Sequence, residues 1–280
     1  MSVNFSVITP SLNMLDYLKR CHASIIDQEN ITVEHIIMDG GSTDGTEEWL
    51  KQNKQAIGVI QKDEGMYDAI NKGLQLAKGN IISYLNCDEQ YLPGTLNFVK
   101  EYMEQHPEVD ILFGNFLVVR SDGSLIAYRK GYTPRWFYIF SSYLYTFSCT
   151  MFIRRRVITD GFRFDGRLKG VGDADFVIRV LRSGYRAAHV KRYLAIFTMT
   201  GKNKYASQEV LLERKHWMAS SPLWVRIFKW PLNFTRLFEK LIYGCFLEKL
   251  PLCYAIYVSG NDANRKYFCV TRASFRWRTE

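Results

Sequence analysis

Four short apolar runs begin at nearly even intervals in the first part of this 280-residue chain. They cover Phe5–Thr9, Val33–Met38, Ile57–Gln61 and Ile81–Leu85, and the segments between them carry apolar residues near helical spacing. Parallel strands need a crossover connection of about a dozen residues or more, usually a helix. The spacing therefore predicts βαβ units and an α/β fold with a doubly wound, mostly parallel sheet flanked by helices.

Further along the chain, some patterns are typical of helices and others of strands. Leu96–Met103 and Phe176–Leu181 have helical spacing, and Ile111–Val119 is typical of a strand. From Pro222 onward the composition changes, because aromatic and basic residues interleave. We therefore predict an α/β domain over residues 1–220 and a helical, basic-aromatic segment over residues 221–280.

Positive charge is concentrated in that second segment. Of the formal net charge of +9, residues 222–280 contribute +6, from ten Lys or Arg against four Asp or Glu. A basic surface favours an anionic partner, which could be a nucleic acid, a lipid headgroup surface or a phosphorylated substrate.

The residue types of the C-terminal segment narrow these choices. Stacking platforms for nucleic acid combine aromatic and basic residues, but the chain has no RNP, KH or helix-turn-helix motif. Trp224, Phe228 and Phe238 with Arg226 and Lys229 are better suited to helices lying in a membrane interface. Packing against the α/β domain, or a dimer contact, is the alternative. We predict an anionic membrane surface as a partner and no nucleic acid.

Other features bear on the compartment. No segment has the length and apolar character of a membrane span, and the N-terminal residues lack the pattern of a signal peptide. The six cysteines form no CxxC pair and no cluster with histidine at zinc spacing. Reduced thiols in the cytosol are the simplest interpretation. We predict a cytoplasmic protein, peripheral at the inner face of the cytoplasmic membrane.

Acidic residues follow three of the four predicted strands. The residues after the first strand begin with Pro10, and Asp39, Asp63 and Asp88 follow the other three. In open α/β sheets, ligands bind beyond the carboxyl ends of the strands, so these acids should share one edge. One carboxylate suits a uracil N–H or ribose hydroxyls, and another suits Mg²⁺ or Mn²⁺ on a diphosphate. Alternatively, each acid is a turn or helix-cap residue.

Several competing motifs are absent from the sequence. There is no GxxxxGK[ST] loop, and the glycines at 40, 41 and 45 do not form GxGxxG. No GxSxG elbow occurs either. These absences exclude P-loop enzymes, dinucleotide-dependent dehydrogenases and α/β-hydrolases.

Six stretches together resemble glycosyltransferase family 2, whose members are inverting enzymes of the GT-A fold. They are SVITPSLN (6–13), HIIMDGGSTDGT (35–46), DEGMYDAINKG (63–73), SYLNCDE (83–89), TMFIRRR (150–156) and GDADFVIRVLRSGY (172–185). The resemblance covers roughly residues 3–200 and extends to bacterial enzymes of polysaccharide or O-antigen assembly.

The resemblance implies a nucleotide-sugar site. Its substrate- and nucleotide-binding residues would be Thr9, Pro10, Asn13, Asp39, Lys62, Asp63, Asp68, Asn71, Lys72, Asn86 and Asp88. Asp39 would accept a hydrogen bond from the nucleobase. Asp68, Asn71 and Lys72 would face the donor or brace its loop. Asp88 matches the metal-binding acid of the DxD motif, with Glu89 as a second or water-mediated contact to Mg²⁺ or Mn²⁺. Asn86 departs from the first Asp of that motif, which weakens the expected metal affinity.

The resemblance also implies the catalytic base. Asp173 matches it, and Asp175 is the second candidate, but positions two apart on a helix face different sides, so one of them should reach the acceptor. A helix cap is the alternative role of Asp173. Ser148 and Cys149 replace the His-Gln that often precedes the aromatic strand in such enzymes, which leaves acceptor recognition open.

We therefore predict an inverting glycosyltransferase. It would move a sugar from a nucleotide-sugar, with UDP favoured, to a saccharide acceptor, lipid-linked through polyprenyl diphosphate, in cell-surface polysaccharide synthesis. Arg or Lys of 154–156 or 167–169 could add phosphate contacts. The alternative is a catalytically inactive nucleotide-sugar-binding or regulatory protein. A nucleotidyltransferase is disfavoured, because TPSLN (9–13) offers neither a glycine-rich loop nor a basic residue.

Overall fold

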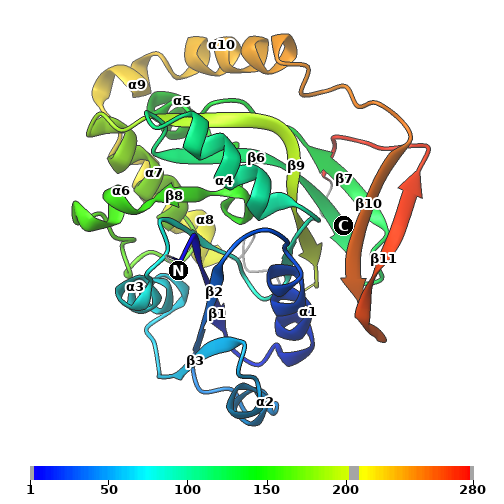
Figure 1. Cartoon of the computed structure of the whole chain (residues 1–280). Coiled ribbons are helices and arrows are strands. Elements are labelled where there is room, and N and C mark those ends of the chain that lie inside the picture. Colours follow the sequence, from blue (N-terminus) through cyan, green and yellow to red (C-terminus); the bar gives the residue numbers. More distant parts are fainter. Residues whose placement is uncertain (1–2, 202–207, 278–280) are drawn as a thin grey trace.

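The protein is built on one large mixed sheet with helices on both faces, as seen in a computed structural model that describes residues 3–201 and 208–277 (Figure 1). In chain order the elements are β1 (Phe5–Ser11), α1 (Leu15–Ile26), β2 (Val33–Asp39), α2 (Thr46–Gln52), β3 (Ala56–Ile60), α3 (Met66–Leu76), β4 (Ile81–Tyr84), β5 (Glu89–Tyr91), α4 (Thr95–Gln105), β6 (Ile111–Arg120), β7 (Leu125–Arg129), α5 (Trp136–Ser141), η1 (Ser148–Thr150), β8 (Phe152–Arg154), α6 (Arg155–Thr159), α7 (Gly172–Arg182), β9 (Ala187–Met199), α8 (Gln208–Ala219), α9 (Leu223–Ile227), α10 (Lys229–Ile242), β10 (Leu252–Val258) and β11 (Asn261–Val270).

The sheet begins with the four predicted strands, all parallel. Its order over the described residues is β3-β2-β1-β4-β8-β6-β9-β5, and β7 pairs with β6. Phe5 of β1 lies opposite Val33 of β2 and Ile81 of β4, and His35 of β2 lies opposite Ala56 of β3. The predicted α/β fold with helical crossovers is therefore confirmed, to within about two residues at each strand end.

The second half of the sheet is mixed. β6 and β9 run parallel to each other, whereas β8 is antiparallel to both β4 and β6. β5 and β7 are antiparallel additions to β9 and β6. The predicted helices over 96–103 and 176–181 and the predicted strand over 111–119 are also present, as α4, α7 and β6.

The sheet is buried on both faces along β1, β4 and β6, as expected for strands that read as continuous apolar runs, whereas the edge strand β3 is largely exposed. Successive side chains of a strand point to opposite faces. Ile8 of β1 therefore packs in a cluster with α3 and α7, whereas Val7 packs in a second cluster with α1 and α4. The helices thus hold the strands from both sides and leave the strand ends to form a site.

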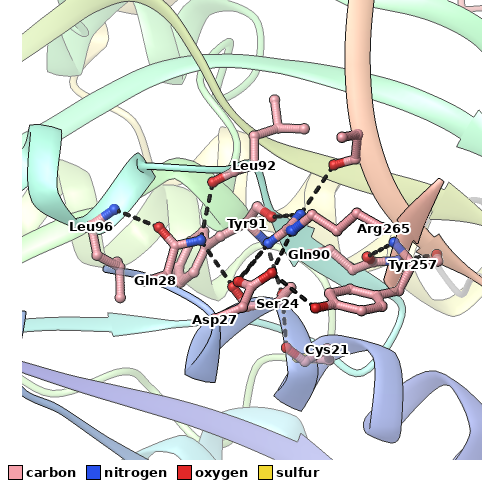
Figure 2. Close-up of polar contacts among 11 residues, drawn as sticks. Cys21, Ser24, Asp27, Gln28, Gln90, Tyr91, Leu92, Leu96, Tyr257 and Arg265 are labelled. Carbon is pink, nitrogen blue, oxygen red and sulfur yellow. Dashed lines mark hydrogen bonds and ion pairs between the residues drawn. The ribbon is translucent and has the colours of Figure 1, made fainter. Parts of the chain in front are cut away.

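A β-hairpin made by β10 and β11 docks against α1 and β5, as Figure 2 shows. Arg265 is the central group: its Nε and Nη2 bind both carboxylate oxygens of Asp27, and its Nη1 donates to the carbonyl of Tyr91 at 2.8 Å. Tyr257 and Gln90 bond each other twice, through the Tyr257 backbone and the Gln90 amide. The C-terminal hairpin is therefore held against α1 and β5 of the N-terminal half by hydrogen bonds and an ion pair.

This hairpin corrects the predicted C-terminal segment. The segment is helical in α9 and α10, as predicted, but from Leu252 to Val270 it is β-structure. The sequence contains a strand signal here, because the apolar residues Leu252, Tyr254 and Ile256, which are buried, recur at every second position. No helix of the described residues has the length and apolar character needed to cross a membrane.

The cysteines also differ from expectation. Cys253 lies opposite Cys269 in the hairpin, and a disulfide joins them. Cys21, Cys87, Cys149 and Cys245 are free and buried. The prediction of reduced thiols is therefore wrong for one pair, because an antiparallel register places two residues distant in sequence directly opposite each other.

Candidate functional site

The loops after β1 and β2 form one hydrogen-bonded unit. Asp39, the last residue of β2, is buried, and its Oδ2 accepts the backbone N–H groups of Gly41 (3.0 Å) and Ser42 (2.8 Å). Ser42 donates its hydroxyl to Asp39 Oδ1 at 2.6 Å. Asn13 Oδ1 accepts the N–H of Thr43 at 2.8 Å. Asp39 and Asn13 therefore shape the loop over residues 40–43.

The two other predicted residues of the first strand have buried or backbone contacts. The Thr9 hydroxyl is completely buried and lies 2.8 Å from His35 Nε2, so its side chain belongs to the core. The Pro10 carbonyl accepts the Cys87 thiol at 3.2 Å, which joins the ends of β1 and β4. Of these two residues, only Pro10 is partly exposed at the sheet edge.

Asp63 lies at the same edge, beside the end of β2. Its Oδ1 accepts the N–H of Gly65 at 2.9 Å, which turns the chain into α3. A Cβ atom at Gly40 would lie 2.9 Å from Asp63 Oδ2, closer than real Cβ atoms approach. Glycine at position 40 therefore allows the loops after β2 and β3 to touch.

Lys62, Asp68, Asn71 and Lys72 form the next part of the edge. Asp68 pairs with Lys72 at 2.8 Å, and Lys72 also donates to the Lys62 carbonyl at 2.9 Å. The Lys72 ammonium is the main cause of the lowered pKa of Asp68. Asn71 bonds the Phe164 backbone twice, at 2.8 Å and 3.0 Å. Asn71 and Lys72 therefore brace the surrounding loops, and the Lys62 side chain is exposed.

Asn86, Asp88 and Glu89 form the turn after β4. Glu89 is completely buried, and its oxygens accept the Asn86 backbone N–H (2.8 Å) and amide (3.3 Å). Burial, and next the charge of Asp88, raise the pKa of Glu89 well above its ordinary value. Asp88 is partly exposed. The expectation that Glu89 contacts a metal is therefore not met, since its oxygens hold the turn.

The described residues contain no group of three or more His, Cys, Asp or Glu side chains arranged to hold a metal ion. Mg²⁺ in nucleotide enzymes is usually bound through one or two carboxylates together with substrate phosphates and water. Asp88, a partly exposed carboxylate at the strand ends, fits that pattern as a single protein ligand. A metal here would thus depend on the diphosphate of a bound nucleotide.

Asp173 lies in the first turn of α7, where a tyrosine from the sheet reaches it. The Tyr84 hydroxyl, at the end of β4, donates to Asp173 Oδ1, and the Asp173 backbone N–H donates to the Tyr67 hydroxyl at 3.3 Å. Burial raises the pKa of Asp173 to about 6, although the tyrosine hydrogen bonds oppose that rise. A carboxyl with such a pKa is suited to exchange a proton near neutral pH.

The start of α7 also excludes the alternative role of Asp173 as a helix cap. The N-cap residue is Val171 and makes no side-chain cap bond, so Asp173 is inside the helix. A Cβ atom at Gly172 would lie 2.5 Å from the Tyr67 ring, and one at Gly170 would lie 2.3 Å from Val210. These two glycines therefore allow close packing of the protein itself.

Asp175 has a different environment from Asp173. Its Oδ2 accepts Arg179 Nε at 2.7 Å, and its Oδ1 accepts the Trp217 indole N–H at 3.3 Å. Both oxygens are thus engaged by fixed partners. Asp175 is better placed to join α7 to α8 than to accept a proton from a substrate.

One acidic residue of this region was not predicted. Glu213 of α8 accepts the backbone N–H groups of Lys169, Gly170 and Val171 at 2.6–2.9 Å, just ahead of α7. An anion near a helix N-terminus is favourable. Glu213 has no motif around it, whereas Tyr67 and Tyr84 lie within the motifs DEGMYDAINKG and SYLNCDE. The position of Tyr84 at the end of its strand was the available signal.

Most basic side chains of 154–156 and 167–169 are engaged elsewhere, whereas Lys169 Nζ donates to the Glu64 carbonyl beside the site at 2.5 Å. Arg154 donates to the carbonyls of Met103 and His106 at the end of α4, and Arg155 to those of Ala77 and Gly79 after α3. Arg156 pairs with Asp110, and Arg167 with Asp165. The suggested phosphate contacts of 154–156 are therefore wrong, because these side chains bond the ends of helices and Asp110.

Polar loops at the carboxyl ends of parallel strands, next to a carboxyl group of raised pKa, are features of nucleotide-binding α/β enzymes. The sheet has a parallel first half and added antiparallel strands, as expected for the GT-A fold.

The chain belongs to glycosyl transferase family 2, whose sequence pattern matches residues 6–162. One relative, a PGL/p-HBAD biosynthesis glycosyltransferase of Mycobacterium bovis, is 33% identical over 120 residues, which is 41% of this chain and 47% of that protein. Another, the putative teichuronic acid biosynthesis glycosyltransferase TuaG of Bacillus subtilis, is 31% identical over 124 residues, or 42% and 49% of the two chains. The matches thus span about half the length of these relatives.

Solved structures of low sequence identity share the fold. The structure of S. aureus TarS 1-349 aligns with a TM-score of 0.61 and 16% identity over 95% of this chain and 99% of that one. The same protein in complex with UDP gives 0.60 and 21% over 78% and 64%. A Pyrobaculum calidifontis mannosyltransferase in complex with GDP-Man and Mn²⁺ gives 0.57 and 15% over 89% and 76%.

Proposed function

We propose that the protein transfers a sugar from a UDP-sugar to a saccharide acceptor, with inversion and with Asp173 as the general base. The observation that carries this proposal is the environment of Asp173, a partly buried carboxyl with a pKa of about 6, bonded by Tyr84 at the end of β4. The family relationship supports glycosyl transfer, and the complex of TarS with UDP supports a uridine donor.

In the proposed reaction, the acceptor oxygen forms a bond to the anomeric carbon while the bond from that carbon to the diphosphate oxygen breaks. Asp173 takes the proton of the acceptor hydroxyl. Tyr84 holds the Asp173 side chain in place through Oδ1. Asp88 would bind Mg²⁺ or Mn²⁺ together with the diphosphate, and the metal, when bound, neutralises charge on the leaving group. The manganese complex of the mannosyltransferase is in line with this assignment.

Donor recognition is assigned to the loops after β1, β2 and β3. Among the described residues, Asp39 Oδ1 accepts one hydrogen bond, from Ser42, where a carboxylate oxygen can accept two. Because Asp39 is completely buried beneath the loop over residues 40–43, we assign its remaining capacity to the imide N–H of a uracil that would displace part of this loop. Asp63 and Lys62 would lie beside the ribose and diphosphate. We further propose a lipid-linked acceptor in cell-surface polysaccharide synthesis, used at the cytoplasmic face of a membrane.

The test compares two carboxylates on one helix. We expect Asp173→Asn to lower turnover on the order of a hundredfold or more, because the proton acceptor is lost, while UDP affinity and thermal stability are kept. Asp175→Asn is the matched control and should keep most of the rate while losing stability, because its ion pair with Arg179 is broken. Full activity of Asp173→Asn in a radiolabelled-sugar transfer assay would refute the role of Asp173 as the base, whereas UDP binding without any transfer by the unaltered protein would favour a nucleotide-sugar-binding protein without catalysis.

A further inference from the structure

Helix α10 packs on the protein with its polar side. Arg236 is only 6% exposed, and the Asn233 amide donates to the Ser141 carbonyl of α5 at 2.9 Å. Glu239 Oε1 accepts the Tyr138 hydroxyl at 3.0 Å. These three α10 residues follow helical spacing and so form one stripe, which faces the body of the protein. A surface helix of a globular protein normally buries its apolar stripe.

The apolar side of α10 consequently points outward, together with that of α9. Six of its residues are 56% to 85% exposed: Leu223, Ile227, Trp230, Phe234, Phe238 and Ile242. We call this set the apolar face. In Figure 1, α9 and α10 lie along the outer edge of the molecule, above α5 and far from α2. Single exposed apolar residues are ordinary, but a contiguous set of this kind marks an interaction site.

A basic cavity borders the apolar face. Its volume is about 260 Å³, and it lies between α5, α8 and α9. Phe140 and Val225 are among its apolar lining residues, and Lys215, Arg226 and Lys229 provide three exposed cations. Among the described residues, no acidic side chain is paired with any of the three. The cavity therefore offers an apolar floor and a positive rim, as an amphiphile with an anionic head requires.

The surroundings of the apolar face are basic as well. Residues 214–250 contain seven Lys or Arg and two acids, Glu239 and Glu248. Glu239 is bonded to Tyr138 and Arg135, and Glu248 lies 3.1 Å from Lys130. Both acids are thus neutralised inside the protein, and the outer surface carries the excess positive charge. Apolar residues in a basic rim are the pattern of helices that lie in an anionic membrane interface.

We propose that the apolar face docks on an anionic lipid bilayer and that the cavity rimmed by Lys215, Arg226 and Lys229 receives the phosphate of a lipid headgroup. A second copy of the chain is the less suitable occupant. A two-fold interface presents the same patch from both subunits, so it would bring the basic rim of one copy against that of the other. A bilayer supplies the missing negative charge.

The docking surface lies next to the acceptor side of the site. Phe140, in the cavity floor, stacks on Trp217 with ring centroids 5.0 Å apart. The Trp217 indole donates to Asp175, two residues beyond Asp173. The use of this surface to present a lipid-linked acceptor rests on the proposed function. Membrane binding itself does not, and it can be measured without any donor or acceptor.

The test uses the full chain with vesicles of phosphatidylcholine, alone or mixed with phosphatidylglycerol, in a flotation assay. We expect binding to the anionic vesicles that weakens with added salt, and little binding to the neutral ones. A basic residue near an anionic surface strengthens binding roughly fivefold. Arg226→Gln with Lys229→Gln should therefore weaken binding roughly 25-fold. The matched control, Lys54→Gln with Lys78→Gln, changes the same charge near the ends of α2 and α3 and should change binding less than about twofold.

Two further variants separate the parts of the surface. Trp230→Ser with Phe234→Ser should lower vesicle binding by about tenfold or more, because two exposed aromatic side chains no longer insert. Tyr267→Ser, on the hairpin, is the control, since Tyr267 is 69% exposed. Ala219→Trp fills the cavity and keeps every charge. It should weaken binding to anionic vesicles if a headgroup enters the cavity.

The outcomes are distinct. Equal binding to neutral and anionic vesicles would overturn the docking surface, and so would unchanged binding in both Arg226→Gln with Lys229→Gln and Trp230→Ser with Phe234→Ser. Unchanged binding of Ala219→Trp would overturn the headgroup cavity. Dimers in light scattering without lipid, abolished by Trp230→Ser with Phe234→Ser, would assign the face to a second copy instead. Unfolding temperature and UDP affinity of each variant verify the fold. Absence of sugar transfer by the unaltered protein, with its vesicle binding intact, would refute only the proposed function.

Discussion

Helices α3 and α10 are both amphipathic, yet they face the protein in opposite senses. α3 buries Tyr67, Ile70 and Leu74 against the sheet and leaves its polar residues at the edge of the candidate site. α10 buries Arg236 and exposes Trp230 and Phe238. An apolar stripe thus marks the inner side of one helix and the outer side of the other.

The comparison separates two uses of polar side chains. At the candidate site, Asp88 follows β4 and Asp173 lies in the first turn of α7, both partly exposed, so their loss should affect chemistry more than folding. Under α10, Asn233 and Glu239 have similar exposure but bond groups of α5, far from the strand ends, so their loss should affect folding more than chemistry. Polar groups buried with partners are costly to leave unpaired.

The largest effect at the site, beside that of Asp173→Asn, is expected for Asp88→Ala. We expect it to abolish the stimulation of transfer by Mg²⁺ or Mn²⁺, a loss on the order of a hundredfold, because metal stabilisation of a leaving group is worth several kcal/mol. The urea unfolding curve should be nearly unchanged. Wild-type transfer that persists in excess EDTA would contradict the metal role. A large loss of stability in Asp88→Ala would show that Asp88, like Glu239, acts mainly on folding.

For the polar side of α10 we expect a loss of stability rather than a loss of activity. Glu239→Leu should lower the free energy of unfolding by about 1–3 kcal/mol, because the Tyr138 hydroxyl and the cations near it lose their partner. Phe238→Ala, on the exposed side of the same helix, should change it by less than about 0.5 kcal/mol. Urea titrations followed by circular dichroism measure both. A larger loss for Phe238→Ala would indicate that the apolar face is packed against protein in solution.

A smaller effect is expected from pH. Because the pKa of Asp173 is raised to about 6, the base is protonated below that value, and transfer should fall roughly tenfold between pH 7 and pH 5. The contribution of this group to stability has the opposite sign: the folded state binds the proton more tightly, so this contribution rises as pH falls from 6 toward 3.8. Asp173→Asn should remove both dependences. If the residual activity of that variant still falls between pH 7 and pH 5, the pH dependence of transfer belongs to another group.

The smallest effect concerns the nucleotide. If Asp39 accepts the imide N–H of uracil, UDP should bind more tightly than GDP by about fivefold, the value of one net hydrogen bond. Calorimetric titration of both nucleotides measures the difference. Tighter binding of GDP would show that Asp39 serves only to shape the loop over residues 40–43, as a structural polar group like Glu239.

Much of the site could be predicted because it depends on local order along the chain. Strand positions follow from apolar runs, and parallel strands place Asp39, Asp63 and Asp88 at one edge whatever the remaining packing. The hydrogen bond of Tyr84 to Asp173 joins residues far apart in sequence, and so do those of Glu213 to Lys169, Gly170 and Val171. No pattern within a window of sequence contains them.

The sequence by itself determined that residues 229–242 are amphipathic, because the 3.6-residue period sorts their side chains into two stripes. It did not determine which stripe faces inward. Tyr138, Arg135 and the Ser141 carbonyl offer hydrogen bonds to Glu239 and Asn233 from one side. Only the tertiary structure brings those partners together, and once they are present the polar stripe gains hydrogen bonds when it packs inward and the apolar stripe is left outside.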